Sequence, residues 1–135
     1  MPLEALTAVS SIDGRYRAVA AELTEHFSEF GLIRARLLVE TEYLIALSET
    51  GIGMRKLSAE EKAILQQLPH ISTEEAQIVK KIEREGYEGI PATNHDVKAV
   101  EYFIKMKLAK TSLADISEWT HFALTSEDVN SIAQG

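Results

Sequence analysis

Apolar residues recur every three or four positions along most of the chain, which is the spacing of one face of an α-helix. From about Ala18 to Leu47 they form one broad side, and Gly51 is a natural stop for the helix that carries them. Gly31 is expected to divide this stretch into a short first helix and a long second one. The predicted buried side consists of Phe27, Phe30, Ile33, Leu37, Leu38, Leu44 and Ile45.

Two capping signals mark the next helices. Ser58 is followed three positions later by Glu61, and Ser72 by Glu75, which is the S-x-x-E pattern of a capping box. Short helices are therefore expected to begin near residues 59 and 73.

A turn-rich segment separates those helices from a further amphipathic one. Residues 85–92, EGYEGIPA, contain two glycines and a proline and are expected to form a loop. The stretch from Asp96 to about Lys110 then predicts a helix, and the members of its buried side are Val97, Val100, Ile104 and Leu108.

The two ends of the chain differ from this pattern. The first fifteen residues resemble an extended arm that ends in a turn at Asp13 and Gly14. Near the other end, residues 116–122 hold three large apolar side chains at a spacing of three, which predicts core packing (Ile116, Trp119 and Phe122). Thr125 and Asp128 then predict another capped helix start. No β pattern of comparable strength appears, so the sequence predicts an all-α fold.

Composition and charge narrow the classes of function. The chain has 135 residues, of which 45% are hydrophobic, enough for the core of one modest domain. Its formal charge of −7 argues against a nucleic-acid groove, although the field near Arg15, His95 and Lys98 can still attract an anionic small molecule. Cysteine is absent, and no leader or membrane-spanning apolar run is recognisable, which suits a cytoplasmic, soluble protein.

The densest group of chemically useful side chains lies in residues 93–103, TNHDVKAVEYF, at a predicted helix entrance. Helix N-termini bind anions because their first N–H groups lack intrahelical partners, and Asn94, His95 and Lys98 complement such a site. Asp96 is placed to fix the tautomer of the imidazole or to cap the helix. The alternative is an ordinary capped helix with a solvated first turn.

Two further sets of residues are candidates for substrate contacts. The Arg15 guanidinium can bind two phosphate oxygens at once, and Tyr16 adds a phenolic donor; the alternative is a solvated surface arginine beside a turn. Thr125 and Ser126 offer hydroxyl and backbone donors at a helix start, which suits a carboxylate, although an ordinary helix cap has the same residues.

Other chemistries lack sequence support. Three histidines (His26, His70 and His121) do not have the spacing of a zinc site, and there is no HExxH pair, so we predict no metal. The chain also lacks a P-loop and a GxGxxG motif, so neither ATP hydrolysis nor dinucleotide binding is indicated.

Three segments together resemble the adenylosuccinate lyase family of the fumarase and aspartase superfamily: SIDGRY (residues 11–16), NHDVKAVEYF (94–103) and HFALTSEDVN (121–130). Similar motifs occur in the family in this order and at about these distances. The resemblance implies that residues 1–135 are the N-terminal helical domain of a longer lyase, without its central helical bundle and C-terminal domain. It also implies a homotetramer in which residues of several subunits form each active site. No cofactor, nucleic-acid partner or membrane partner is expected.

The resemblance also implies a role for each matching residue. Arg15 and Tyr16 match a pair that contacts the substrate, around its nucleotide phosphate. The trio Asn94, His95 and Asp96 matches substrate-binding residues. Thr125 and Ser126 match the residues that hold the succinyl, later fumarate, part of the substrate.

The family cleaves adenylosuccinate to AMP and fumarate, and carries out the equivalent cleavage of succinylaminoimidazole carboxamide ribotide (SAICAR), by β-elimination. Its general acid is a histidine of a Thr-His-Gly motif and its general base a serine of an SSxMPxKxN loop. Neither motif occurs in these 135 residues, so the resemblance implies an inactive chain that carries part of the substrate pocket. Two alternatives remain: a non-catalytic helical interaction domain, or another lyase such as argininosuccinate lyase.

Overall fold

The computed structural model describes residues 3–10 and 13–135, and within them the fold is all-α, as predicted. No β-strand occurs in these ranges, apart from an isolated bridge between Tyr87 and Ile90. The elements, in chain order, are α1 (Asp13–Ala20), η1 (Ala21–Leu23), α2 (Thr24–Phe27), α3 (Glu29–Thr50), α4 (Ala59–Gln67), α5 (Thr73–Arg84), α6 (Asp96–Leu108), η2 (Ala114–Trp119) and α7 (Ser126–Gln134).

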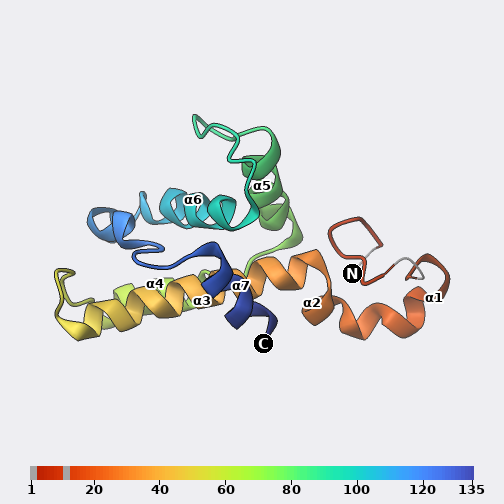
Figure 1. Cartoon of the computed structure of the whole chain (residues 1–135), viewed down its shortest axis with the longest axis horizontal. Coiled ribbons are helices and arrows are strands. Elements are labelled where there is room, and N and C mark those ends of the chain that lie inside the picture. The colour runs from red at the N-terminus through yellow and green to blue at the C-terminus, as the bar shows by residue number, and fades with distance from the viewer. Residues whose placement is uncertain (1–2, 11–12) are drawn as a thin grey trace.

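The long helix α3 forms the base of the molecule (Figure 1). Its start corrects one prediction, because the break lies at Ser28 and Gly31 is inside the helix. Ser28 has extended backbone angles, and its hydroxyl accepts a hydrogen bond from the N–H of Gly31 at 3.1 Å. Gly31 instead permits close packing, since a Cβ there would lie 2.4 Å from the carbonyl oxygen of Glu25. Gly51 ends α3 in the left-handed conformation, as predicted.

The N-terminal region corrects a second prediction. Asp13 and Gly14 do not form a reversal but open α1, a helix with non-helical backbone angles at Tyr16. The preceding segment is held against the rest of the fold, where the carbonyl oxygen of Leu6 accepts from the N–H of Phe30 at 2.9 Å. Ser11 and Ile12, also assigned to the arm, lie outside the described residues.

The predicted caps of α4 and α5 are confirmed. In α4 the Ser58 hydroxyl accepts from the N–H of Glu61 at 3.2 Å, and the Glu61 carboxylate accepts from the N–H of Ser58 at 3.0 Å. In α5 the reciprocal pair is Ser72 and Glu75. Each capping box satisfies two backbone N–H groups that the helix itself leaves unpaired.

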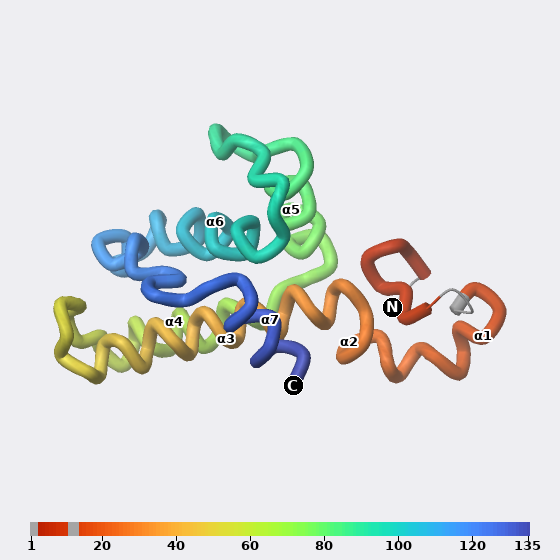
Figure 2. The backbone as a smooth tube through the Cα atoms, in the orientation of Figure 1, coloured from red at the N-terminus to blue at the C-terminus, as the bar shows by residue number. Residues whose placement is uncertain are grey.

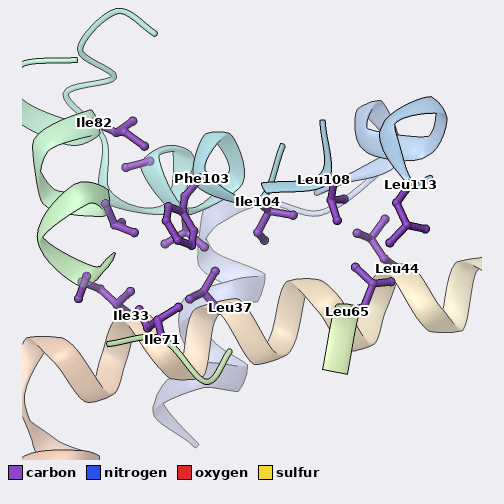
Figure 3. Packing of buried hydrophobic residues seen from close by; sticks show 14 of the residues in the cluster. Ile33, Leu37, Leu44, Leu65, Ile71, Ile82, Phe103, Ile104, Leu108 and Leu113 are labelled. Carbon is purple, nitrogen blue, oxygen red and sulfur yellow. The ribbon is translucent and has the colours of Figure 1, made fainter. Parts of the chain in front are cut away.

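The core lies between α3 and α6, with further side chains from α4, α5 and the segment after α6. Figure 3 shows Phe103, Ile104 and Leu108 of α6 facing Leu37 and Leu44 of α3. The predicted buried side of α6 is confirmed in full. Two members predicted for the earlier stretch are wrong, because Phe27 and Leu38 are exposed, and near the C-terminus Phe122 is exposed as well.

The tube in Figure 2 shows how this packing places α6 and α7. Helix α6 extends along α3, whereas α7 crosses α3 near the beginning of α6, and α1 lies at the far end of the molecule (Figures 1 and 2). Within the described ranges no helix is both long and apolar enough to cross a bilayer.

Candidate functional site

The entrance to α6 is fixed by its connection to α5. The N–H of Thr93 donates to the carbonyl of Ile82 at 3.1 Å, and the N–H of Asn94 donates to that of Glu83 at 2.8 Å. Asn94 itself adopts the left-handed conformation with φ of 51°, which asparagine tolerates better than most residues. The loop therefore delivers the chain to His95 in a defined direction.

His95 is the N-cap of α6, and this position determines which ring nitrogen is free. Its Nδ1 accepts a hydrogen bond from the backbone N–H of Lys98 at 3.2 Å. An accepting Nδ1 carries no proton, so in this arrangement the neutral ring carries its proton on Nε2. The exposed Nε2–H can donate to an oxygen outside the helix.

The start of α7 supplies such an oxygen. Thr125 and Asp128 form the predicted capping box, with N···O distances of 3.2 Å and 2.9 Å. The next residue, Ser126, places its Oγ 3.3 Å from Nε2 of His95. The structure thus brings together two of the predicted segments, residues 94–96 and 125–126, at the meeting point of two helix N-termini.

The electrostatics of this point combine two helix dipoles with acidic first turns. Each helix N-terminus contributes roughly half a positive charge. The Thr125 N–H and hydroxyl lower the pKa of Asp128. Burial alone would raise the pKa of Asp96, but the Val97 N–H and Arg36 outweigh it, so that pKa is also lowered. Both carboxylates are therefore ionised at neutral pH and already engaged with local donors.

Arg36 is a residue of this site that the sequence analysis missed. It lies on α3 with only 6% of its surface exposed. Its Nη2 donates to Oδ2 of Asp96 at 2.8 Å, and its Nε donates to Oδ1 of Asn130 at 3.0 Å. One oxygen of the Asp96 carboxylate thus holds α6 to α3, while the other, Oδ1, accepts from the N–H of Val97 in the first turn of α6 at 2.8 Å.

Glu40, one turn further along α3, makes a second missed contact. It is fully buried, and its Oε1 lies 2.5 Å from Nδ1 of His121, while its Oε2 has no hydrogen-bond partner among the described residues. His121 and Ala123 both have positive φ angles, 65° and 61°, so Glu40 fixes the strained turn that leads to Thr125. A signal existed, since Glu40 and Arg36 are charged residues on the mainly apolar buried face of α3.

The structure does not bring Arg15 and Tyr16 to this cluster. Both are exposed on α1, with the guanidinium 5.9 Å from the centre of the Tyr16 ring. Helix α1 lies apart from α6 and α7 in Figure 1. A separate apolar groove of about 600 Å³ between α4, α5 and α6 contains none of the predicted site residues.

Comparison with known proteins gives one consistent relationship. No protein-family model matches the chain. Curated proteins named adenylosuccinate lyase do: that of Vibrio cholerae is 43% identical over 134 residues, covering 96% of this chain. Those of Escherichia coli and Dictyostelium discoideum are 41% and 40% identical, covering 98% and 97% of it.

These relatives are much longer than the chain, which spans 28% of the length of each. Within that span the similarity runs through all three segments that carry the resemblance. The resemblance to the adenylosuccinate lyases is thereby confirmed along nearly the whole chain, and the all-α fold is consistent with it.

Proposed function

We propose that this chain is the N-terminal substrate-binding domain of an adenylosuccinate lyase of purine biosynthesis. The parent protein would eliminate fumarate from adenylosuccinate, giving AMP, and from SAICAR in the same way. One observation carries this proposal: His95 and Ser126 are 31 positions apart in the sequence, yet they lie 3.3 Å apart where α6 and α7 begin. Their donors converge on one small region of the surface.

The arrangement suits the carboxylates of a succinyl group. The Nε2–H of His95, the hydroxyl of Ser126 and the backbone N–H groups that open α7 are donors, and a carboxylate accepts only. On binding, a substrate oxygen would take the place that the Ser126 hydroxyl now occupies next to Nε2. Asn94 and Thr125 border this region, whereas Asp96 contributes by holding the start of α6 to Arg36.

We propose that Arg15 and Tyr16 contact the nucleotide phosphate through the assembly of several subunits that the resemblance implies. Their exposed position on α1 leaves the guanidinium and the phenol accessible to a ligand held by another copy. A guanidinium is suited to this because it binds two phosphate oxygens and stays charged.

The proposal is tested in the full-length protein by replacing His95 with Ala. Loss of a hydrogen bond to a charged substrate group costs about 1.5 to 3 kcal/mol, or roughly 10-fold to 150-fold in kcat/KM. His70→Ala is the matched control, because His70 is an exposed histidine outside the cluster. Equal kcat/KM values for the two folded, assembled variants would mean that His95 is only a helix cap.

A second test concerns the chain alone. The proposed general acid and base motifs are not in its sequence, and each such group typically contributes about 100-fold to 10,000-fold to the rate. We therefore expect the purified 135-residue chain to release no measurable fumarate from adenylosuccinate, followed by absorbance. Turnover similar to that of a complete lyase would contradict this assignment of roles.

A further inference from the structure

One side chain of α3 contacts both helices whose starts form the proposed site. Arg36 donates to Asp96, the first residue of α6, and to Asn130, which lies one helical turn after Ser126 in α7. The two acceptors are 60 and 94 positions away in the sequence. No other hydrogen-bonding group among the described residues of this site joins α3, α6 and α7.

The chemistry of a guanidinium makes this contact directional. Its N–H groups lie in one plane at fixed angles, so two hydrogen bonds from one guanidinium constrain the relative orientation of their acceptors. Asp96 is adjacent to His95, and Asn130 lies on the same side of α7 as Ser126. Arg36 therefore links the two segments that carry Nε2 of His95 and Oγ of Ser126.

Stability alone gives little reason for a charged residue at this position. Replacing a buried ion pair by well-packed apolar side chains is often neutral or stabilising. Asp96 is half exposed, so part of the charge interaction is also weakened by solvent. A requirement on geometry explains the arginine better.

We propose that Arg36 is a positioning residue that sets the separation of the two substrate-binding segments. This inference rests on the proposed function and adds a residue that touches no substrate. Because the acid and base lie elsewhere in that proposal, a misplaced binding segment weakens ground-state and transition-state binding alike. Such a change raises KM and leaves kcat nearly unaltered.

The test is Arg36→Met in the full-length protein, with Arg55→Met as the matched control. Arg55 also binds two acidic residues, Glu61 and Asp115, but it lies beyond the C-terminal end of α3. For Arg36→Met we expect KM for adenylosuccinate to rise about 10-fold to 100-fold, with kcat within about threefold of the original. Arg36→Lys keeps a positive charge for Asp96 but lacks the planar guanidinium. Its KM is expected to lie between those of the original protein and Arg36→Met.

For Arg55→Met we expect a lowered Tm and an unchanged KM. Equal KM values for Arg36→Met and Arg55→Met would overturn the proposal, because the effect of Arg36 would then be one of general stability. If Arg36→Met does not fold, Asn130→Ala removes only the α7 contact, and its KM is expected to rise severalfold; an unchanged KM in this variant overturns the proposal.

A crystal structure of the Arg36 variant separates this inference from the proposed function. If the original protein does not cleave adenylosuccinate, the proposed function fails. The positioning role of Arg36 is then judged only by the distance between the two segments in the crystal structures. The positioning role is supported if the distance between His95 Nε2 and Ser126 Oγ is well beyond 3.3 Å in Arg36→Met but unchanged in Arg55→Met. An unchanged separation overturns it.

Discussion

Replacing Glu61 by Gln removes the charge at the centre of a network that joins α4 to two neighbouring segments. One carboxylate oxygen accepts from the Ser58 N–H at 3.0 Å and from Nη1 of Arg55 at 2.9 Å. The other accepts from Nη2 of Arg55 at 2.7 Å and from the Ser112 hydroxyl at 2.9 Å. Glutamine has the same shape, but only one of its two terminal atoms is an oxygen that can accept hydrogen bonds. Its NH₂ group would face two of the four donors and could not accept from them.

The expected loss follows from the number of bonds and their exposure. A hydrogen bond to a charged group contributes about 1.5 to 3 kcal/mol, against about 0.5 to 1.5 kcal/mol for a neutral one. The Arg55 side chain is 39% exposed, so solvent screening reduces the charged contribution. We expect Glu61→Gln to lower the free energy of unfolding by about 1 to 2 kcal/mol at neutral pH, or Tm by roughly 4 to 8 °C.

The loss depends on pH with a definite sign. Arg55, then the Ser58 N–H, lower the pKa of Glu61 from 4.5 to about 2. Between these two pH values the unfolded chain binds more protons at this position than the folded chain, so stability falls as the pH falls. The contribution of the Glu61 charge is complete above about pH 5 and is lost toward pH 2, where the variant and the original converge.

Urea denaturation at about pH 7 and about pH 3 measures this difference. Glu60→Gln is the control, because it makes the same chemical change one residue earlier on an exposed side chain, with an expected effect within about 0.5 kcal/mol. The reasoning is refuted if Glu61→Gln costs the same at both pH values, or no more than Glu60→Gln.

Three further changes test other parts of the fold. Gly31→Ala should destabilise by about 1 to 3 kcal/mol, because the new Cβ meets the Glu25 carbonyl oxygen, and a stabilised variant in thermal denaturation would contradict this. Thr125→Ala should cost about 0.5 to 2 kcal/mol through loss of the α7 cap and speed hydrogen exchange there; unchanged exchange would refute it. Burial raises the pKa of Glu40 despite the neighbouring His121, so the contribution of Glu40 to stability should fall as the pH rises above 4.5. Glu40→Gln should weaken this pH dependence of the unfolding free energy in denaturant titrations, and an unaltered pH dependence would count against the prediction.

Local signals in the sequence were sufficient for most helix boundaries. The starts of α4, α5 and α7 depend on a hydroxyl and a carboxylate three residues apart, and both partners of each capping box are therefore visible in the sequence. The end of α3 depends on Gly51, which adopts a backbone conformation that favours glycine. These interactions involve neighbours along the chain, so the fold adds little to them.

The errors occurred where a distant contact decided the outcome. Composition predicts a helix break at Gly31, but this residue lies within α3, where the Glu25 carbonyl oxygen of α2 leaves no room for a side chain. Leu38 has the spacing of a buried residue and is exposed, since the core contacts of α3 come from α6 on a different side. Periodicity predicts that a helix has an apolar face, but not how wide a face its neighbours cover.

In the candidate site, too, the features set by neighbouring residues were predictable and those set by distant contacts were not. The start of α6 at Asp96 and the capping box of Thr125 and Asp128 were predictable from the sequence, but His95 as the cap of α6 was not. The meeting of the two helix starts was not predictable either, since it depends on how α7 crosses α3. Arg36 could be recognised in the sequence only as a charged residue on an apolar helix face. Such a residue has to find partners inside the fold, because an unpaired buried charge is too costly. In this protein its partners lie directly beside the two predicted binding segments, so the charged interruptions of the α3 face indicate where distant parts of the proposed site are held together.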